Sequence, residues 1–353
     1  MKILPLIVLV LCLGMTTSCN KDDDTRRSPA ANPCPSPFCG VEPTVVSSGL
    51  EITFLNHELE YPKSKYSVFF KLDQASNPVT NLTVDDVVVK DNGQVIEFES
   101  ANELTPDPQS FGFHIALIVD LSESVTESAV LPQVKEAMAA FVNTILVGSN
   151  SDVGETFVAI YYFDGDPDLV ALQNFTQNSD ELLSTIDNIS ADLTRDNSTN
   201  LNGAFISGAS IIKSRVNNSP KLVDVGTMVV FTDGSDLAGL SSFEEASVAV
   251  QGLSDGENQI DVYTIGLGQS VDNNVLQQLG YSGYYPSANF TSLTPTFEDI
   301  AAELNAEVNS YYKLEYCSPR RAGQTEIIIE INKNNVTGRI ESCINSDCTP
   351  DPC

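Results

Sequence analysis

The order of apolar segments between residues 111 and 310 constrains the fold of this chain more than any other feature. Short apolar runs suited to β-strands alternate with longer segments whose apolar residues recur every three or four positions, as on one face of a helix. We predict strands over residues 111–121, 156–163, 227–231 and 260–267, and helices over 134–145, 181–189, 201–216, 243–253, 271–279 and 297–310. Such alternation favours an α/β domain whose mostly parallel sheet is covered by helices on both faces.

A different pattern of apolar and polar residues precedes this region. Over residues 50–98 apolar and polar residues alternate, as in strands with one buried face. The runs 87–89 and 95–96 flank Asp91-Asn92-Gly93, and Asn-Gly between apolar runs is a strong β-hairpin signal. We therefore predict a small all-β sandwich over 48–107 and the α/β domain over 108–311. We predict further strands over 312–343, which would complete the sandwich if they pair back onto it. A tail over 344–353 follows.

Three polar loops of the predicted α/β domain carry oxygen-bearing side chains. Asp120-Leu121-Ser122-Glu123-Ser124 ends the first strand, Thr232-Asp233-Gly234 ends the strand over 227–231, and Thr199 precedes a predicted helix. Ligands of open α/β sheets bind at the carboxyl ends of the strands, where Asp120 and Asp233 fall. Carboxylate and hydroxyl oxygens are ligands that suit a small hard cation.

The pattern Asp-x-Ser-x-Ser, then a lone Thr, then Thr-Asp-Gly, in this order, resembles the metal-ion-dependent adhesion site of the von Willebrand factor type A family. The resemblance implies a Rossmann-like domain that holds one Mg²⁺ or Mn²⁺, in preference to Ca²⁺, and leaves one coordination position for an acidic group of a partner. The ligands that it implies are Asp120, Ser122, Ser124, Thr199 and Asp233. The alternative is that these residues form ordinary strand-end turns and helix caps, where Ser, Thr and Asp are common.

The first residues have the composition of an export signal. Lys2 precedes an apolar run over residues 3–13 that is too short to span a bilayer, and small polar residues lead to Cys19. Residues 1–18 resemble a bacterial lipoprotein signal, which implies an acylated Cys19 followed by a flexible tether over 19–47. Asp22-Asp23-Asp24 resembles the acidic tag of lipoproteins on the outer surface of Gram-negative cells. We expect a lipid-anchored outer-membrane protein that faces the cell exterior; a secreted protein with a charged start is the alternative.

Cysteine usage also favours export. Cys12 falls in the signal, and six cysteines remain after Cys19: Cys34, Cys39, Cys317, Cys343, Cys348 and Cys353. An even set in an exported protein favours disulfides, although the sequence alone does not fix their pairing. Because Cys317 and Cys343 bracket one strand-rich segment, we predict that they pair. Free thiols or a cysteine-bound metal are the alternatives.

Charge and residue spacing exclude several functions. The formal net charge of −30 would repel a phosphate backbone, so we expect no nucleic-acid partner. His114 lies on the strand that leads to Asp120, roughly 26 Å from Ser122 along an extended chain, too far for a catalytic triad. We expect a structural histidine there. Asp164, Asp166 and Asp168 have the spacing of a calcium loop but lack its later Gly and Glu, so we predict a turn.

These features favour a cell-surface lipoprotein that binds a protein or glycan ligand through a divalent-metal-dependent adhesion site. The alternative is a cell-envelope scaffold that assembles surface protein complexes, and the third hypothesis is a metal-dependent hydrolase. We expect no enzyme, because no general base or phosphate-binding glycine loop accompanies the predicted oxygen ligands. We also expect Asp120→Ala to leave the fold nearly intact, because a residue at the end of a strand should lie outside the core.

Overall fold

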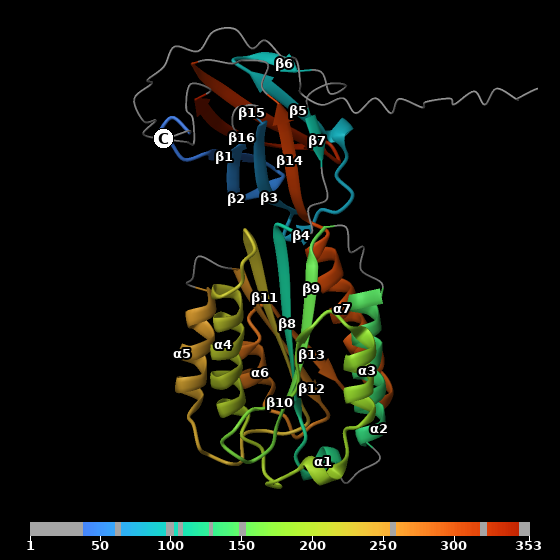
Figure 1. Ribbon diagram of the computed structural model, residues 1–353. Helices are drawn as coiled ribbons and strands as arrows, with labels where there is room; N and C mark the ends of the chain where they lie inside the picture. Colours follow the sequence, from blue (N-terminus) through green and yellow to red (C-terminus); the bar gives the residue numbers. More distant parts are fainter. Residues whose placement is uncertain are drawn as a thin grey trace, which may run out of the picture.

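The structure is a computed structural model that describes residues 38–60, 65–96, 102–104, 109–126, 130–147, 153–254, 259–317 and 323–345. An all-β part and an α/β part are stacked end to end (Figure 1). The predicted signal, Cys19, Cys34, Cys348, Cys353 and most of the predicted tether lie outside the described residues. Among the helices that are described, none combines the length and the hydropathy needed to cross a membrane.

The α/β part is built on a six-stranded sheet with the order β10-β9-β8-β11-β12-β13. The strands are β8 (Phe111–Asp120), β9 (Glu155–Phe163), β10 (Val170–Thr176), β11 (Val223–Thr232), β12 (Gln259–Leu267) and β13 (Gly283–Ser287). All neighbouring pairs are parallel except β10 and β9. The predicted class, a mostly parallel sheet flanked by helices, is therefore confirmed.

Two layers of helices cover the sheet (Figure 1). The helices are α1 (Glu123–Thr126), α2 (Val130–Val142), α3 (Ser179–Asp187), α4 (Leu201–Asn217), α5 (Phe243–Ser254), α6 (Asn273–Leu279) and α7 (Leu293–Val308), with a π-helical turn over Asn143–Val147. Helices α2, α3 and α7 pack on the face that carries Ile115 and Leu117 of β8, whereas α4, α5 and α6 pack on the face of Ala116 and Ile118. Alternate residues of β8 thus enter two separate cores, which explains its nearly unbroken apolar sequence.

The two edge strands, β10 and β13, were not predicted. In β10, apolar and polar residues alternate weakly, and its pairing with β9 shifts in register at two places. β13 contains Pro286, a residue that usually indicates a turn. A proline is tolerated in an edge strand, because the N–H group that it lacks can be one that would face solvent instead of a neighbouring strand.

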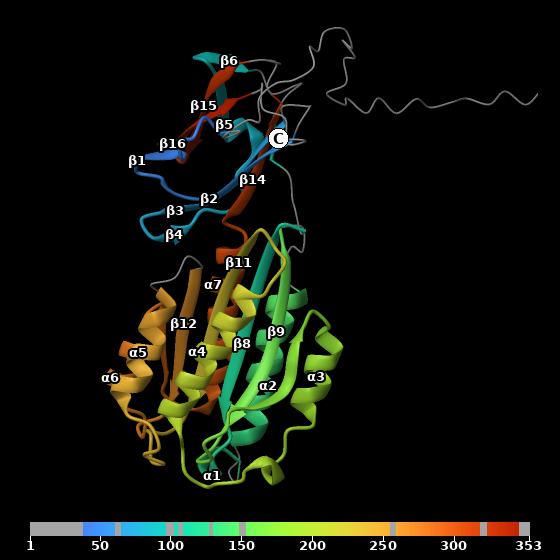
Figure 2. The ribbon, with the colours of Figure 1, turned by 60° about the vertical axis from the view of Figure 1, so that its left-hand side comes forward.

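The all-β part is a sandwich of two sheets that combines strands from both ends of the chain (Figure 2). One sheet has the order β1-β16-β15-β5-β6 and the other β2-β3-β14-β7, with β4 paired to β3. The strands are β1 (Thr44–Ser48), β2 (Glu51–Glu60), β3 (Lys65–Gln74), β4 (Asn77–Pro78), β5 (Val87–Asp91), β6 (Gln94–Ile96), β7 (Asn102–Leu104), β14 (Tyr311–Cys317), β15 (Gln324–Lys333) and β16 (Val336–Asn345). The C-terminal strands therefore do pair back onto the N-terminal ones.

The predicted hairpin and the predicted apolar face of β3 are both present. Asp91 pairs with Gln94 across Asn92 and Gly93, and both turn residues have positive φ angles, of 47° and 79°. This is the backbone conformation that Asn-Gly favours in two-residue hairpins. Tyr66, Val68, Phe70 and Leu72 all lie in the sandwich core, as their alternation predicted.

The opposite face of β3 is also buried, because it packs against the α/β part. Phe69 packs edge-on against Phe111 at the start of β8, and Tyr311 packs edge-on against both Phe111 and Phe113. Beside these rings, the Lys71 ammonium lies 2.5 Å from a Glu307 carboxylate oxygen. This interface holds the amino end of β8 against the sandwich, so the carboxyl end of the strand points away from it (Figure 1).

The predicted pairing of Cys317 with Cys343 is wrong. Cys343 forms a disulfide with Cys39, with 5.8 Å between their Cα atoms, and Cys317 is disulfide-bonded as well. Cys317 ends β14 and Cys343 lies in β16, so the two residues belong to opposite sheets of the sandwich. Cys39 instead lies just ahead of β1, which pairs directly with β16. Nearness in sequence misled the prediction, because the pairing depends on contacts between the two ends of the chain.

Removing this disulfide should destabilise the sandwich. The double variant Cys39→Ser/Cys343→Ser should lose roughly 2–5 kcal/mol of unfolding free energy, because the unfolded chain would regain the freedom that the bridge removes. Thermal unfolding with and without reductant measures the loss, and the variant should respond less to reductant than the native protein. Recovery of a Cys317–Cys343 peptide from the unreduced native protein would contradict the pairing.

Candidate metal centre

The five residues predicted to bind a metal ion lie at the end of the α/β part that is farthest from the sandwich. Asp120 ends β8, and Ser122 and Ser124 follow it into the short helix α1, which marks this end in Figure 1. Asp233 follows β11 directly, and Thr199 comes just before the N-terminus of α4. The five residues therefore come from three loops.

Asp120 is fully buried, with an exposed fraction of 0%. One carboxylate oxygen accepts a hydrogen bond from the Ser122 backbone N–H (2.9 Å), and the other accepts one from the Thr232 hydroxyl (2.6 Å). Burial raises the pKa of the Asp120 carboxyl to about 6, although these hydrogen bonds act in the opposite direction. The premise that Asp120 lies outside the core is wrong. Alanine at this position would leave the buried Ser122 N–H without its acceptor, so we now expect Asp120→Ala to destabilise the fold.

The side chain of Ser124 contacts those of both Ser122 and Asp233. The Ser124 hydroxyl donates to an Asp233 carboxylate oxygen at 2.8 Å and lies 3.3 Å from the Ser122 hydroxyl. Burial raises the pKa of the Asp233 carboxyl, whereas the hydrogen bond from Ser124 acts to lower it. Together with the bond between Asp120 and Ser122, these contacts connect four of the five predicted residues.

Thr199 approaches the same place from the third loop. Its hydroxyl oxygen lies 3.5 Å from the position that a Cβ atom at residue 234 would occupy. Thr199 therefore faces the loop that carries Asp233 and Gly234. Its backbone carbonyl accepts hydrogen bonds from Leu237 N–H (2.9 Å) and Ala238 N–H (3.1 Å). Two of the three loops are thus joined through Thr199.

Two aspartates outside the predicted ligand set hold these loops in place. Asp164 accepts backbone hydrogen bonds from Asp166 (2.8 Å) and Arg195 (2.7 Å), so it organises the loop that leads to Thr199, in agreement with the predicted turn. Asp236 accepts one from Asn202 N–H (2.8 Å) in the first turn of α4. The bonds to Arg195 and Asn202 have no local sequence signal, because each joins segments more than thirty residues apart in the chain.

The oxygens gathered here fit the chemistry of a small hard cation. Two carboxylates and neighbouring hydroxyls provide oxygen ligands, which Mg²⁺ and Mn²⁺ prefer to nitrogen and sulfur. Within the part of the chain that the structure describes, there is no group of three or more His, Cys, Asp or Glu residues that could hold a metal ion. An ion at this place would therefore depend on the hydroxyl groups as well as on Asp120 and Asp233.

Both histidines lie elsewhere. His114 is buried near the start of β8, where its Nε2–H donates to Asp224 (2.7 Å) and its Nδ1 accepts from Arg215 Nε (3.1 Å). It is the structural histidine that was predicted. His57 lies in the sandwich and stacks on Phe38. Neither ring lies near Ser122 or Ser124, at the opposite end of β8.

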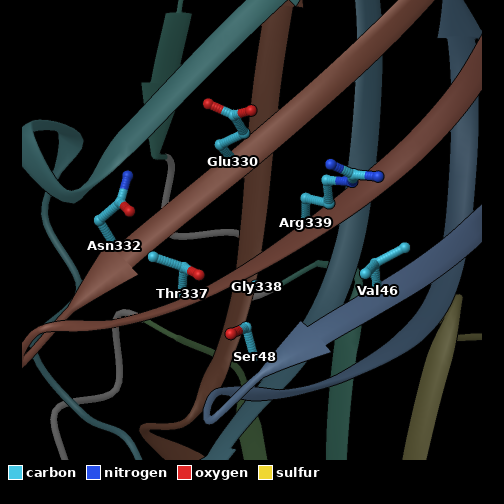
Figure 3. A pocket seen from close by; sticks show the side chains of 7 residues that line it. All are labelled: Val46, Ser48, Glu330, Asn332, Thr337, Gly338 and Arg339. Carbon is cyan, nitrogen blue, oxygen red and sulfur yellow. The ribbon is translucent and has the colours of Figure 1, made fainter.

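A separate hollow of about 270 Å³ lies on the outer face of the sandwich and is lined by Val46, Ser48, Glu330, Asn332, Thr337, Gly338 and Arg339 (Figure 3). Its charged groups are paired with neighbours on the same sheet. Arg339 contacts Glu341 (2.6 Å), and Glu330 contacts Lys90 (2.6 Å). The charges of this hollow are therefore neutralised within the sandwich.

Several solved structures resemble this one. The conserved hypothetical protein BatB from Bacteroides thetaiotaomicron is 16% identical, with a TM-score of 0.43 over 56% of this chain and 100% of that chain. The vWF domain of the type V pili tip protein Mfa5 from Porphyromonas gingivalis is 14% identical, with a TM-score of 0.44 over 58% and 97%. Proximal thread matrix protein 1 from the mussel byssus, with a zinc-occupied MIDAS motif, is 16% identical, with a TM-score of 0.43 over 60% and 49%.

The family is established from the sequence match. A search of curated proteins finds no match to the chain. The model of the von Willebrand factor type A domain matches residues 114–303, which is more than half of the chain. The chain therefore belongs to this family, as its three polar loops predicted.

Thr232→Val should reveal how far the site depends on the buried Asp120. Valine has nearly the same shape as threonine but leaves an Asp120 oxygen and the Gly234 N–H without their partner hydroxyl. We expect a loss of about 1–3 kcal/mol of unfolding free energy, seen as a fall in melting temperature of several degrees.

Thr227→Val is the matched control, because Thr227 is buried in the same strand and shows no side-chain hydrogen bond within the described residues. It should change the melting temperature little. Equal losses in the two variants would mean that the hydroxyl of Thr232 contributes nothing specific.

Proposed function

We propose that this von Willebrand factor type A protein is a cell-surface lipoprotein that binds an extracellular protein or glycan through a divalent cation. The cation would be Mg²⁺ or Mn²⁺, held by Asp120, Ser122, Ser124, Thr199 and Asp233. The observation that carries this proposal is the set of contacts joining Asp120, Ser122, Ser124 and Asp233, which come from two different loops. A cation bound there would supply a positive centre for an anionic oxygen of the partner.

The proposed ligands differ in how deeply they are buried. Asp120 is buried between Ser122 and Thr232 and sets the positions of both loops, while Ser124 and Asp233 lie nearer the surface. If only one of the two carboxylates contacts the cation directly, the occupied site keeps a net positive charge. It would then attract an acidic group to a chain whose own charge is strongly negative.

Reversible binding is supported better than hydrolysis. Activation of a serine requires a base within hydrogen-bond distance, and both histidines are engaged in other parts of the molecule. The Ser124 hydroxyl donates to a carboxylate that is itself a proposed metal ligand, so that carboxylate is not free to act as a general base. The hydroxyls therefore serve better as ligands than as nucleophiles.

The position of the proposed site suits binding at a distance from a membrane anchor. The described chain enters the sandwich just before β1, and the proposed metal site lies at the far end of the α/β part (Figure 2). A lipid anchor at Cys19 would therefore place the sandwich next to the membrane and the metal site outermost.

Mg²⁺ should stabilise the native protein. A ligand that binds only the folded state adds about 2.7 kcal/mol at a hundredfold excess over Kd, so the melting temperature should rise with Mg²⁺. Asp120→Asn and Ser124→Ala should abolish this rise. Asparagine is preferred to alanine at position 120, because its amide can still bond to Ser122 N–H and to the Thr232 hydroxyl.

Glu123→Gln is the matched control, because it removes a negative charge from the same loop at a position not proposed as a ligand. It should keep the Mg²⁺-dependent rise. If all variants respond as the native protein does, the ion only screens general negative charge and the proposed site is wrong.

If Cys19 is acylated and the protein faces outward, it should be bound to the membrane with its sandwich and α/β part accessible from outside the cell. Protease added to intact cells should remove the protein, and Cys19→Ala should release it from the membrane fraction. Full-length protein that survives protease treatment of cells with an intact envelope would argue against surface display. Lysed cells treated in the same way serve as the control for protease sensitivity.

A further inference from the structure

The loop that follows Asp233 exposes two leucines beside the proposed metal site. Leu237 has an exposed fraction of 75% and Leu240 of 55%. Their neighbours in the loop are polar or small: Ser235, Asp236, Ala238, Gly239, Ser241 and Ser242. Single exposed apolar residues are common on protein surfaces. Two leucines within four positions of one binding loop are a local concentration.

Hydrogen bonds at both ends hold this loop in one conformation. The backbone N–H groups of Leu237 and Ala238 both donate to the Thr199 carbonyl. The Asp236 carboxylate accepts from Gly239 N–H (2.9 Å) and Asn202 N–H (2.8 Å). Beyond Leu240, the Asn202 side-chain amide donates to the Ser241 carbonyl (3.0 Å). The leucines are therefore fixed relative to Thr199, and a partner would lose little affinity in ordering them.

Charge limits what can approach this surface. The chain carries a net charge of −30, so an acidic partner gains little from general electrostatic attraction and depends on the cation. Apolar contact adds affinity that does not depend on charge. Burial of one leucine is enough to change a dissociation constant by roughly tenfold or more.

We propose that Leu237 and Leu240 form an apolar subsite next to the metal ion, and that the partner is a protein segment carrying a carboxylate close to a large apolar side chain. The carboxylate would meet the cation while the apolar side chain covers the leucines. A protein segment satisfies both contacts, whereas a glycan presents mainly hydroxyl groups. This inference rests on the proposed metal-dependent binding and specifies the chemistry of its ligand.

A random peptide library displayed on phage tests the proposal. The library is applied to the immobilised protein in Mg²⁺, and bound phage are released with EDTA. Released peptides should share an Asp or Glu with an aliphatic or aromatic residue close to it in sequence. A peptide of this kind is then synthesised and its Kd measured against the native protein and its variants.

The informative variant is Leu237→Ser/Leu240→Ser, and the matched control is Val248→Ser on α5, where Val248 is 70% exposed. The double variant should raise the Kd of the selected peptide at least tenfold. It should keep the Mg²⁺-dependent rise in melting temperature, because neither leucine is a proposed ligand. The control should change neither quantity.

Four results would overturn the proposal in distinguishable ways. Acidic peptides without an apolar neighbour, or equal Kd values for native and double-variant proteins, would refute the apolar subsite while leaving metal-dependent binding intact. Failure to recover any EDTA-released peptide from a protein that Mg²⁺ stabilises would refute a peptide ligand. If Mg²⁺ has no effect on stability either, the proposed function itself is wrong. Mg²⁺-dependent dimers that the double variant loses would assign the leucines to self-association instead.

Discussion

The arrangement of the proposed site depends on a single buried carboxylate. Burial of a charged group is costly unless hydrogen bonds replace the lost water, and Asp120 receives them from the Ser122 backbone and the Thr232 hydroxyl. These two donors belong to the ends of adjacent parallel strands, so one residue fixes two loops relative to each other. Ser124 and Asp233 meet because these loops are fixed. The geometry available to a cation thus follows from the hydrogen bonding of Asp120.

Much of the α/β part could be predicted, because its information is local. Apolar periodicity identified the inner strands and most helices, and the three polar loops identified the family. Residues whose roles depend on distant partners were missed. The bonds of Asp164 to Arg195 and of Asp236 to Asn202 give no local signal, because each joins two separate segments of the chain. The same reason explains the wrong disulfide, since Cys39 meets Cys343 only after β1 has paired with β16.

The sandwich depends on both ends of the chain, and the α/β part is inserted between them. β14 pairs with β3 and β15 pairs with β5, so each sheet contains strands from both sides of the insertion. Contacts of such long sequence separation form slowly, because a large loop must close first. The alternation of Tyr66 to Leu72 predicted one buried face of β3, but nothing local predicted that Phe69 and Lys71 would be covered by the α/β part.

The bond between Cys39 and Cys343 changes how the protein would respond to tension on the chain ahead of β1. Without the crosslink, a pull there would act first on β1, an edge strand held by β16 alone within its sheet, which can be peeled away one residue pair at a time. With it, the same pull also reaches β16, which is held by β1 and β15 on its two sides. The crosslink would therefore divide such a force between β1 and β16.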